Sequence, residues 1–243
     1  MKKIFLLSAL LLALVSTASV AQYREGRYRL QHDPAPIGFL KIGTQIPFQH
    51  SVIYDHGITP GFSINGGIGF ITAPYTNMMF SGLENKGLIK SSERAVIDRT
   101  FQVGVTYQLG ANFHFNRNYV RAYGQLMRLN GDMSYSDLAN LYLGTNIPDI
   151  TRFLNPIDIR SNVPMVGVLY GRRFSIGERS EIHLEGSIGK TLGHDTRYKT
   201  STFLDGINLV NDIVYSGIDN DLDTYFTKHG WLPSLNVYYV FKL

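Results

Sequence analysis

The chain of 243 residues contains no cysteine, and it lacks any apolar run of the roughly 18 residues that a helical membrane span needs. Without cysteine there is neither a disulfide framework nor a thiol to carry a lipid anchor. Without long apolar runs, helical membrane spans are excluded as the basis of the fold. The chain also lacks a large excess of positive charge. Its formal net charge of +4 is too small to predict nucleic acid as a partner.

The N-terminus does contain a leader-like pattern. Two lysines precede an apolar stretch at residues 4–15, and a small-x-small pattern ends at Ala21. A basic start, a short apolar core and a small-residue cleavage site are typical of a secretory signal peptide. We expect residues 1–21 to be a signal peptide and residues 22–36 to be an N-terminal tail or a short first strand.

The stretch at residues 100–129 alternates between apolar and polar residues for longer than a usual soluble strand does. A short turn at residues 116–118 separates its two arms. About 10 residues of tilted strand cross a bilayer, so the stretch predicts a hairpin with one face toward lipid. The apolar members of the first arm are Phe101, Val103, Val105, Tyr107, Leu109, Ala111, Phe113 and Phe115.

Similar alternation recurs along the chain, and seven strands are clear. They cover residues 40–54, 61–71, 100–114, 119–128, 164–175, 181–192 and 231–243. Bacterial single-chain barrels have an even number of strands, so one more is needed. It lies either at residues 24–31 or in a division of residues 37–55 at Pro47, which cannot donate a ladder hydrogen bond. We predict eight strands, with ten as the alternative if a loop supplies another hairpin.

The connections alternate between tight turns and segments of tens of residues at 72–99, 130–162 and 193–229. With the leader, the alternating segments and the last strand, this pattern resembles the small outer-membrane β-barrels of Gram-negative bacteria (OmpA-like, OmpW-like or porin-like barrel domains). The resemblance covers residues 37–243 and implies an all-β, antiparallel, up-and-down transmembrane barrel. It also implies an outer-membrane location, membrane lipid and the barrel assembly machinery as partners, and a C-terminal assembly signal. The residues of that signal are Leu235, Val237, Tyr239, Phe241 and Leu243, where the family normally ends in an aromatic residue.

The polar face of the strands is the candidate site. An eight-stranded barrel is just wide enough for its own side chains, and charges in so narrow a space must be paired. We therefore expect a lumen filled by polar side chains. The predicted lumen-facing residues are Gln102, Gln108, Asn112, Arg121, Tyr123, Gln125, Glu181, His183 and Glu185.

Three functions remain open at this stage. The first is a non-enzymatic barrel with a structural or surface-binding role, whose long loops carry short helices that cover the mouth or bind a ligand or protein. The second is a narrow passive porin for small solutes. The third is a barrel enzyme acting on lipid or peptide, suggested by His183, Glu185 and Ser187 on one face of one strand. Residues two apart in a strand lie about 7 Å from each other, too far for a nucleophile and its base, so we predict no enzyme.

Aromatic residues near strand ends predict the girdles that flank the lipid-facing band of such barrels. They are Tyr107, Phe113, Phe115, Tyr119, Phe174, Tyr239 and Phe241. The acidic repeat of Asp219, Asp221 and Asp223 resembles the start of a calcium loop, but Thr224 occupies the position of its turn glycine. We predict no metal site and no cofactor.

Overall fold

The computed structural model describes residues 38–72, 103–133, 157–199 and 230–243. It also describes residues 216, 219, 220, 222, 223, 226 and 227. The expected signal peptide and the N-terminal segment at residues 22–36 lie outside this described part of the chain. The short loop helices that the sequence predicts, one beginning near Ser136, one near Pro148 and one at residues 204–213, also lie outside it. None of the helical residues that the structure describes belongs to a helix long and apolar enough to cross a membrane.

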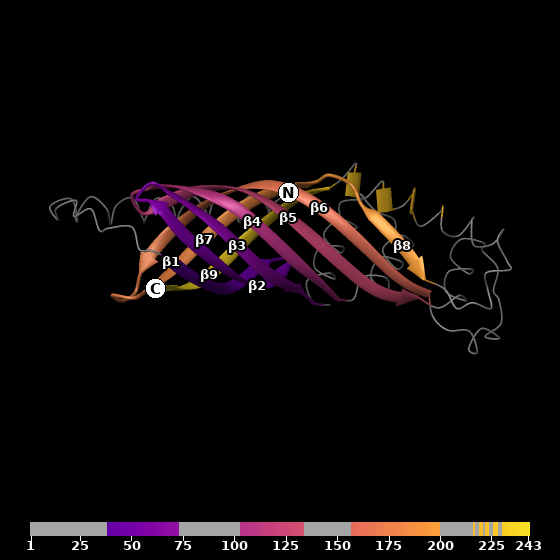
Figure 1. Cartoon of the computed structure of the whole chain (residues 1–243), viewed down its shortest axis with the longest axis horizontal. Coiled ribbons are helices and arrows are strands. Elements are labelled where there is room, and N and C mark those ends of the chain that lie inside the picture. The colour runs from indigo at the N-terminus through magenta and orange to yellow at the C-terminus, as the bar shows by residue number, and fades with distance from the viewer. Residues whose placement is uncertain are drawn as a thin grey trace, which may run out of the picture. The chain divides into compact units, whose positions relative to one another are not determined.

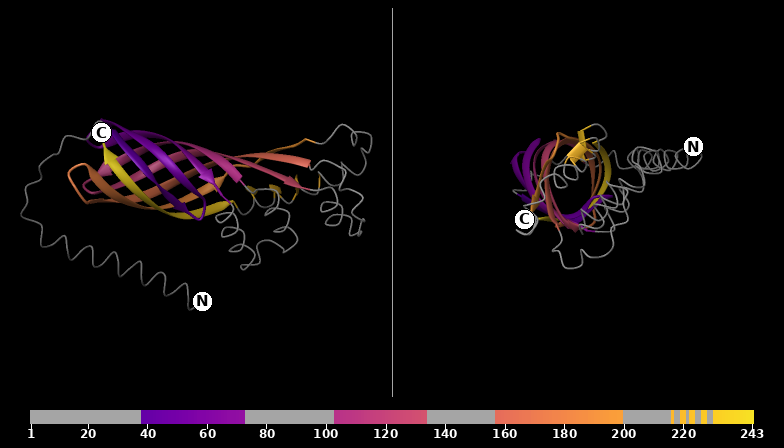
Figure 2. Two further views of the ribbon diagram at one scale, coloured as in Figure 1. Left: turned by 90° about the horizontal axis from the view of Figure 1, so that it is seen from below. Right: turned by 90° about the vertical axis from the view of Figure 1, so that its right-hand side faces the viewer.

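Eight of the nine described strands form a closed antiparallel barrel (Figure 1). The ring runs in the order β1, β2, β3, β4, β5, β6, β7, β9 and closes where β9 pairs with β1, as the end-on view of Figure 2 shows; β8 lies outside the ring and pairs with β6. The prediction of an eight-stranded up-and-down barrel is confirmed. The strands are β1 (Gly38–Ile46), β2 (Gln49–Thr59), β3 (Phe62–Ile71), β4 (Val103–Phe115), β5 (Asn118–Met133), β6 (Ile157–Ser175), β7 (Ser180–Thr191), β8 (Asp195–Lys199) and β9 (Trp231–Lys242).

The eighth strand of the ring comes from the division at Pro47. The segment at residues 40–54 is two strands, β1 and β2, joined at Pro47 and Phe48, with Gln45 paired to Gln49. This tight connection lies at the same end of the barrel as the long segments. The predicted strict alternation of tight turns and long loops is therefore wrong at this one connection.

The two ends of the barrel differ. The short connections at residues 60–61, 116–117 and 176–179 lie at one end, and Leu243 donates a backbone hydrogen bond to Gly38 there. We call this the turn end, and the opposite one the loop end. In outer-membrane barrels short turns face the periplasm and long loops face outward.

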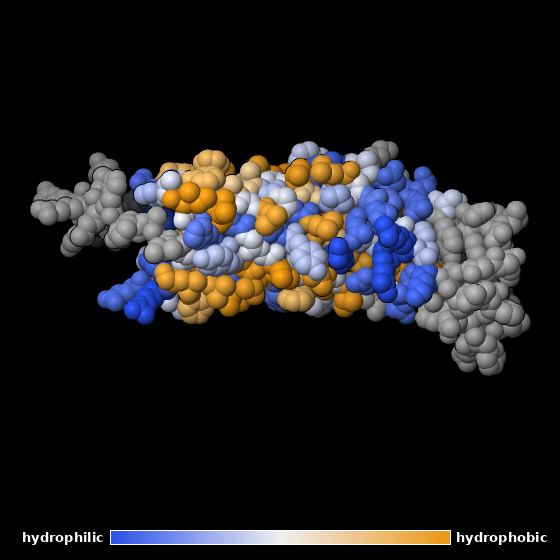
Figure 3. All heavy atoms as spheres, viewed as in Figure 1, coloured by the Kyte–Doolittle hydropathy of each residue, from blue (hydrophilic) through white to orange (hydrophobic). Residues whose placement is uncertain are grey.

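The alternation of β4 explains how its two faces are used. Leu109 is 73% exposed, whereas Gln108 beside it is 6% exposed. The same period of two runs through the other barrel strands, so apolar side chains cover the outside, and the inside holds the buried polar side chains together with some apolar ones. Figure 3 shows apolar residues over the barrel wall and hydrophilic residues gathered at the loop end. A closed wall with an apolar exterior satisfies every strand edge and suits a bilayer.

At the loop end, the hairpin of β5 and β6 extends beyond the other strands. β8 pairs with this extension, from Asp158 opposite Lys199 to Asn162 opposite Asp195. The exposed side chains here are charged, including Arg160 and Arg197. Along β6 the exposed side chains are apolar at Val166, Val168 and Tyr170 and charged at Arg160. This change marks where β6 extends beyond the apolar exterior of the barrel.

Candidate functional site: the filled lumen

Glycines on the inner wall make room for the large side chains that fill the barrel. A Cβ built on Gly171 would overlap the ring of Tyr119, and one on Gly167 would lie 2.6 Å from the ring of Tyr123. Both tyrosines are on β5 and both glycines are on the neighbouring β6. The missing side chains let the tyrosine rings lie across the wall of the next strand.

Four fully buried charges meet inside the barrel. Lys41 Nζ lies 3.1 Å from Asp55 Oδ2 and 3.8 Å from Glu185 Oε1. Arg121 Nη2 lies 3.4 Å from the same Glu185 oxygen. The four side chains come from β1, β2, β5 and β7, so the ion pairs connect opposite parts of the ring. Two positive and two negative groups balance, which is the condition under which buried charges are tolerated.

Neutral groups supply further hydrogen bonds to this ionic cluster (Lys41, Asp55, Arg121 and Glu185). Asn112 accepts a 2.7 Å hydrogen bond from Arg121 Nε and donates one of 2.7 Å to Asp55 Oδ2. Asn236 donates to Glu185 Oε2 at 3.1 Å, and the hydroxyl of Tyr119 donates to Glu185 Oε1. A buried ion pair contributes net stability only when its remaining donors and acceptors are satisfied. These hydrogen bonds satisfy Arg121 Nε and both oxygens of Glu185, whereas Asp55 Oδ1 has no hydrogen-bond partner among the described residues.

A second set of contacts continues toward the turn end. Glu181 accepts a hydrogen bond of 2.9 Å from His183 Nε2, and its other oxygen lies 2.9 Å from Lys242 Nζ. His183 Nδ1 lies 3.1 Å from the hydroxyl of Tyr119, which connects this set to the ionic cluster. The polar filling therefore extends from Lys242 at the turn end to the ionic cluster. From Glu185 it continues toward the loop end through Asn236, Ser234, Gln45 and Gln49.

The β5–β6 wall near the loop end is filled differently. Its inward residues Met127, Leu129, Ile159 and Val163 are apolar and buried. Leu222 and Phe226, from the segment that follows β8, are 1% exposed. Thr191 donates to the carbonyl of Phe226, which attaches this segment to the end of β7.

Among the predicted lumen-facing residues, the structure buries every one that it describes. Gln102 lies outside the described residues. Asn112, Arg121 and Glu185 belong to the ionic cluster and its immediate partners, and Glu181 and His183 to the set at the turn end. The remaining three, Gln108, Tyr123 and Gln125, are 5–6% exposed and contact neither set in the described hydrogen bonds.

Three important residues were not among those predicted. Lys41 and Asp55 occupy the odd-numbered positions of β1 and β2, opposite the apolar even-numbered residues. That alternation was the signal that could have found them. Tyr119 was assigned to an aromatic girdle, and this was wrong because the side chain points inward and is fully buried over Gly171.

The contacts of the proposed hydrolase residues do not pair a nucleophile with a base. His183 contacts Glu181 and Tyr119, whereas Ser187 bonds Ser234. Hydroxyl–imidazole contacts occur elsewhere: Ser63 Oγ lies 2.8 Å from His114 Nε2, with Ser63 2% exposed, and Thr44 Oγ1 lies 2.8 Å from His50 Nδ1. Among the described residues no carboxylate bonds the other ring nitrogen of His114, which would be needed to orient a general base.

No group of three or more His, Asp or Glu side chains in the described part of the chain is placed to hold a metal ion. Two of the three acidic residues of the calcium-like repeat bond protein groups. Asp219 accepts from the hydroxyl of Tyr198 and Asp223 from Thr227. Asp221 lies outside the described residues.

Comparison with known proteins gives structural likeness only. No protein-family model and no curated protein sequence matches the chain. A major outer membrane protein from Thermus thermophilus is similar in structure, with 11% identity, a TM-score of 0.48, and coverage of 85% of this chain and 98% of that one. CarO2 of Acinetobacter baumannii is similar with 10% identity, a TM-score of 0.33, and coverage of 86% and 98%. CarO from the same organism has 10% identity, a TM-score of 0.30, and coverage of 88% and 100%.

Likeness at this level carries no argument about function. The fold is assigned from three features of the structure: a closed eight-stranded ring, an apolar exterior and an interior that contains ion pairs. These are the features of an outer-membrane β-barrel, and they locate the chain in the outer membrane.

Proposed function

We propose that the protein is a non-enzymatic outer-membrane barrel with a closed lumen, and that it acts in a structural or surface-binding role through its long segments at the loop end. The observation that carries the proposal is the ionic cluster. Lys41, Asp55, Arg121 and Glu185 are fully buried and reach one another from four strands. A permeating solute would have to separate these pairs, and breaking one buried pair costs about 3–5 kcal/mol.

Conductance across planar bilayers tests this proposal. We expect the folded wild-type protein to insert without stepwise currents whose size depends on salt concentration. A known porin added afterwards to the same bilayer supplies the positive control. Stepwise currents from the wild-type barrel would contradict a closed lumen and favour a narrow passive porin.

The surface role is tested on intact cells. Extracellular protease is expected to cut within residues 73–102, 134–156 or 200–215 and to leave the barrel strands protected. Cells expressing a variant in which residues 134–156 are replaced by a short Gly/Ser linker provide the control for cleavage in that segment. A chain that resists the protease on intact cells, yet is cut in the same segments after lysis, would place them away from the cell surface.

The C-terminal strand is proposed to carry the assembly signal recognised by the barrel assembly machinery. Its outward residues are exposed on β9, which closes the ring against β1, and on the residue that follows it. They are Leu235, Val237, Tyr239 and Phe241 on β9, and Leu243 after it. Replacing Phe241 by Ser is expected to lower the amount of folded barrel in the outer membrane, whereas the same change at Phe113 is expected to have a smaller effect.

A further inference from the structure

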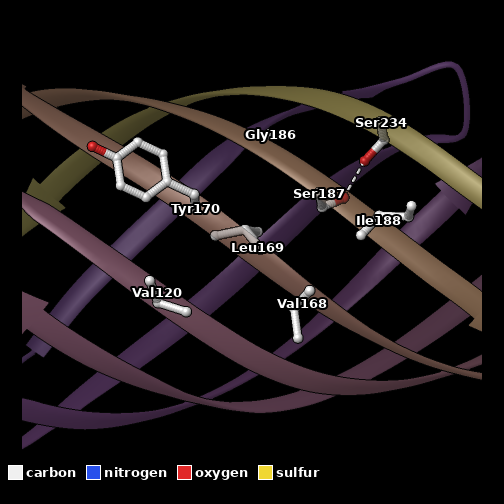
Figure 4. Close-up of a pocket in the computed structure, with 8 residues that line it drawn as sticks. All are labelled: Val120, Val168, Leu169, Tyr170, Gly186, Ser187, Ile188 and Ser234. Carbon is white, nitrogen blue, oxygen red and sulfur yellow. Dashed lines mark hydrogen bonds between the residues drawn. The ribbon is translucent and has the colours of Figure 1, made fainter.

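The lipid-facing wall carries a groove over β5, β6 and β7 (Figure 4). Its volume is about 400 Å³, and Val120, Val168, Tyr170 and Ile188 line it with outward apolar side chains. Behind it, Ser187 and Ser234 bond each other across β7 and β9, as the dashed line shows. The groove is therefore apolar on the membrane side and backed by a satisfied polar pair.

Gly186 explains why the wall is hollow at this place. It points outward on β7 opposite Tyr170 of β6, and a Cβ built on it would meet no atom within 4 Å. The inward glycines Gly167 and Gly171 are crowded by tyrosine rings, so they are needed for packing. Nothing in the packing around Gly186 requires a glycine. Its missing side chain leaves space that an apolar ligand can fill.

A positive charge follows the groove toward the turn end. Arg172 is two residues beyond Tyr170 on the same outward face of β6, about 7 Å along the strand. Its guanidinium carbon lies 5.4 Å from the centre of the Phe174 ring, which holds it against the wall. An apolar groove that leads to a guanidinium matches an amphiphile with an acyl chain and an anionic head group.

We propose that this groove binds one glycerophospholipid, with an acyl chain over Gly186 and the phosphate at Arg172. The position of Arg172 toward the turn end assigns the lipid to the periplasmic leaflet. Neither the apolar lining nor the charge depends on whether the lumen conducts or what the loops bind. The inference is therefore separate from the proposed function and can fail without it.

Native mass spectrometry of the folded barrel in detergent, with added palmitoyl-oleoyl phosphatidylglycerol, tests the site. Filling the groove with Gly186→Leu is expected to weaken retention of the first lipid about tenfold. Arg172→Gln is expected to weaken it by a smaller factor, since it removes the phosphate contact and leaves the groove. The matched control is Gly124→Leu, because Gly124 also points outward with no atom within 4 Å of a built Cβ and does not line the groove.

Heat-dependent gel mobility verifies that each variant has folded before its lipid binding is compared. Equal retention by the wild type and Gly186→Leu would overturn the proposal. Preferential retention of lipopolysaccharide over phosphatidylglycerol would overturn the leaflet assignment. A dimer that is lost in Gly186→Leu would instead identify the groove as a contact between two copies of this chain.

Discussion

The interior along β1, β2 and β9 holds hydrogen-bonded charged and amide side chains beside a small apolar cluster, whereas the inward face of β5 and β6 near the loop end is mainly aliphatic. The ionic cluster depends on every partner being present, because a charge left alone inside the barrel is expensive. The aliphatic wall, represented by Met127, Leu129, Ile159 and Val163, depends on close packing and tolerates small changes. These two parts of the interior are therefore expected to respond differently to mutation.

The largest expected effect is in the ionic cluster. Arg121→Ala leaves Glu185 with Lys41 as its one remaining cation and removes the donor to Asn112. We expect a loss of about 3–5 kcal/mol in the free energy of unfolding, measured by urea titration of the barrel in phospholipid vesicles.

The double variant Arg121→Met with Glu185→Met sharpens this result. It removes both charges and leaves the Lys41–Asp55 pair in place. We expect it to recover most of the stability, because well-packed apolar residues can replace a buried ion pair. A double variant that is less stable than Arg121→Ala would show that apolar side chains cannot replace the Arg121–Glu185 ion pair at this place in the barrel.

A smaller effect is expected where a tyrosine lies over a glycine. Gly171→Ala would put a methyl group into the space of the Tyr119 ring, and overpacking of this kind costs about 1–3 kcal/mol. The matched control is Gly124→Ala, whose methyl group meets no atom within 4 Å. Equal unfolding free energies for the two variants would mean that the tyrosine ring moves aside at no cost.

The smallest effect is expected in the aliphatic wall. Ile159→Val removes one buried methyl group from a fully buried side chain and should cost about 0.5–1.5 kcal/mol by the same urea titration. The control is Ile58→Val, because Ile58 is exposed at the end of β2. We expect this variant to show no measurable change in the free energy of unfolding. If Ile159→Val lowered the free energy of unfolding as much as Arg121→Ala does, the ionic cluster and the aliphatic wall would not differ in their sensitivity to mutation.

Period-two alternation predicted the barrel and its two faces, but it could not divide β1 from β2. Gln45 pairs with Gln49, so the connection through Pro47 and Phe48 keeps odd-numbered residues inside on both strands. A hairpin whose paired residues are an even number apart preserves the alternation, and the sequence therefore looks like one long strand. Only Pro47 marked the turn.

The sequence also could not predict which inward side chains contact each other. Alternation placed Arg121 and Glu185 on inward faces, but they are 64 residues apart and meet only because the ring closes. The inward position of Tyr119 depends on Gly171 in the neighbouring strand, through a register that the sequence alone does not specify. Local periodicity determines faces, whereas closure and register determine partners.

The absence of cysteine makes the central claim directly testable, since each introduced cysteine is the only one in the chain. Spin labels placed singly from residue 103 to residue 113 of β4, in lipid vesicles, report contact with oxygen in the bilayer and with a water-soluble nickel reagent. We predict strong oxygen contact at Val103, Val105, Tyr107, Leu109 and Phe113 and weak contact with both reagents at Thr106, Gln108 and Asn112. Oxygen contact without a period of two, or strong nickel contact at the even positions, would contradict a lipid-facing exterior around a filled interior.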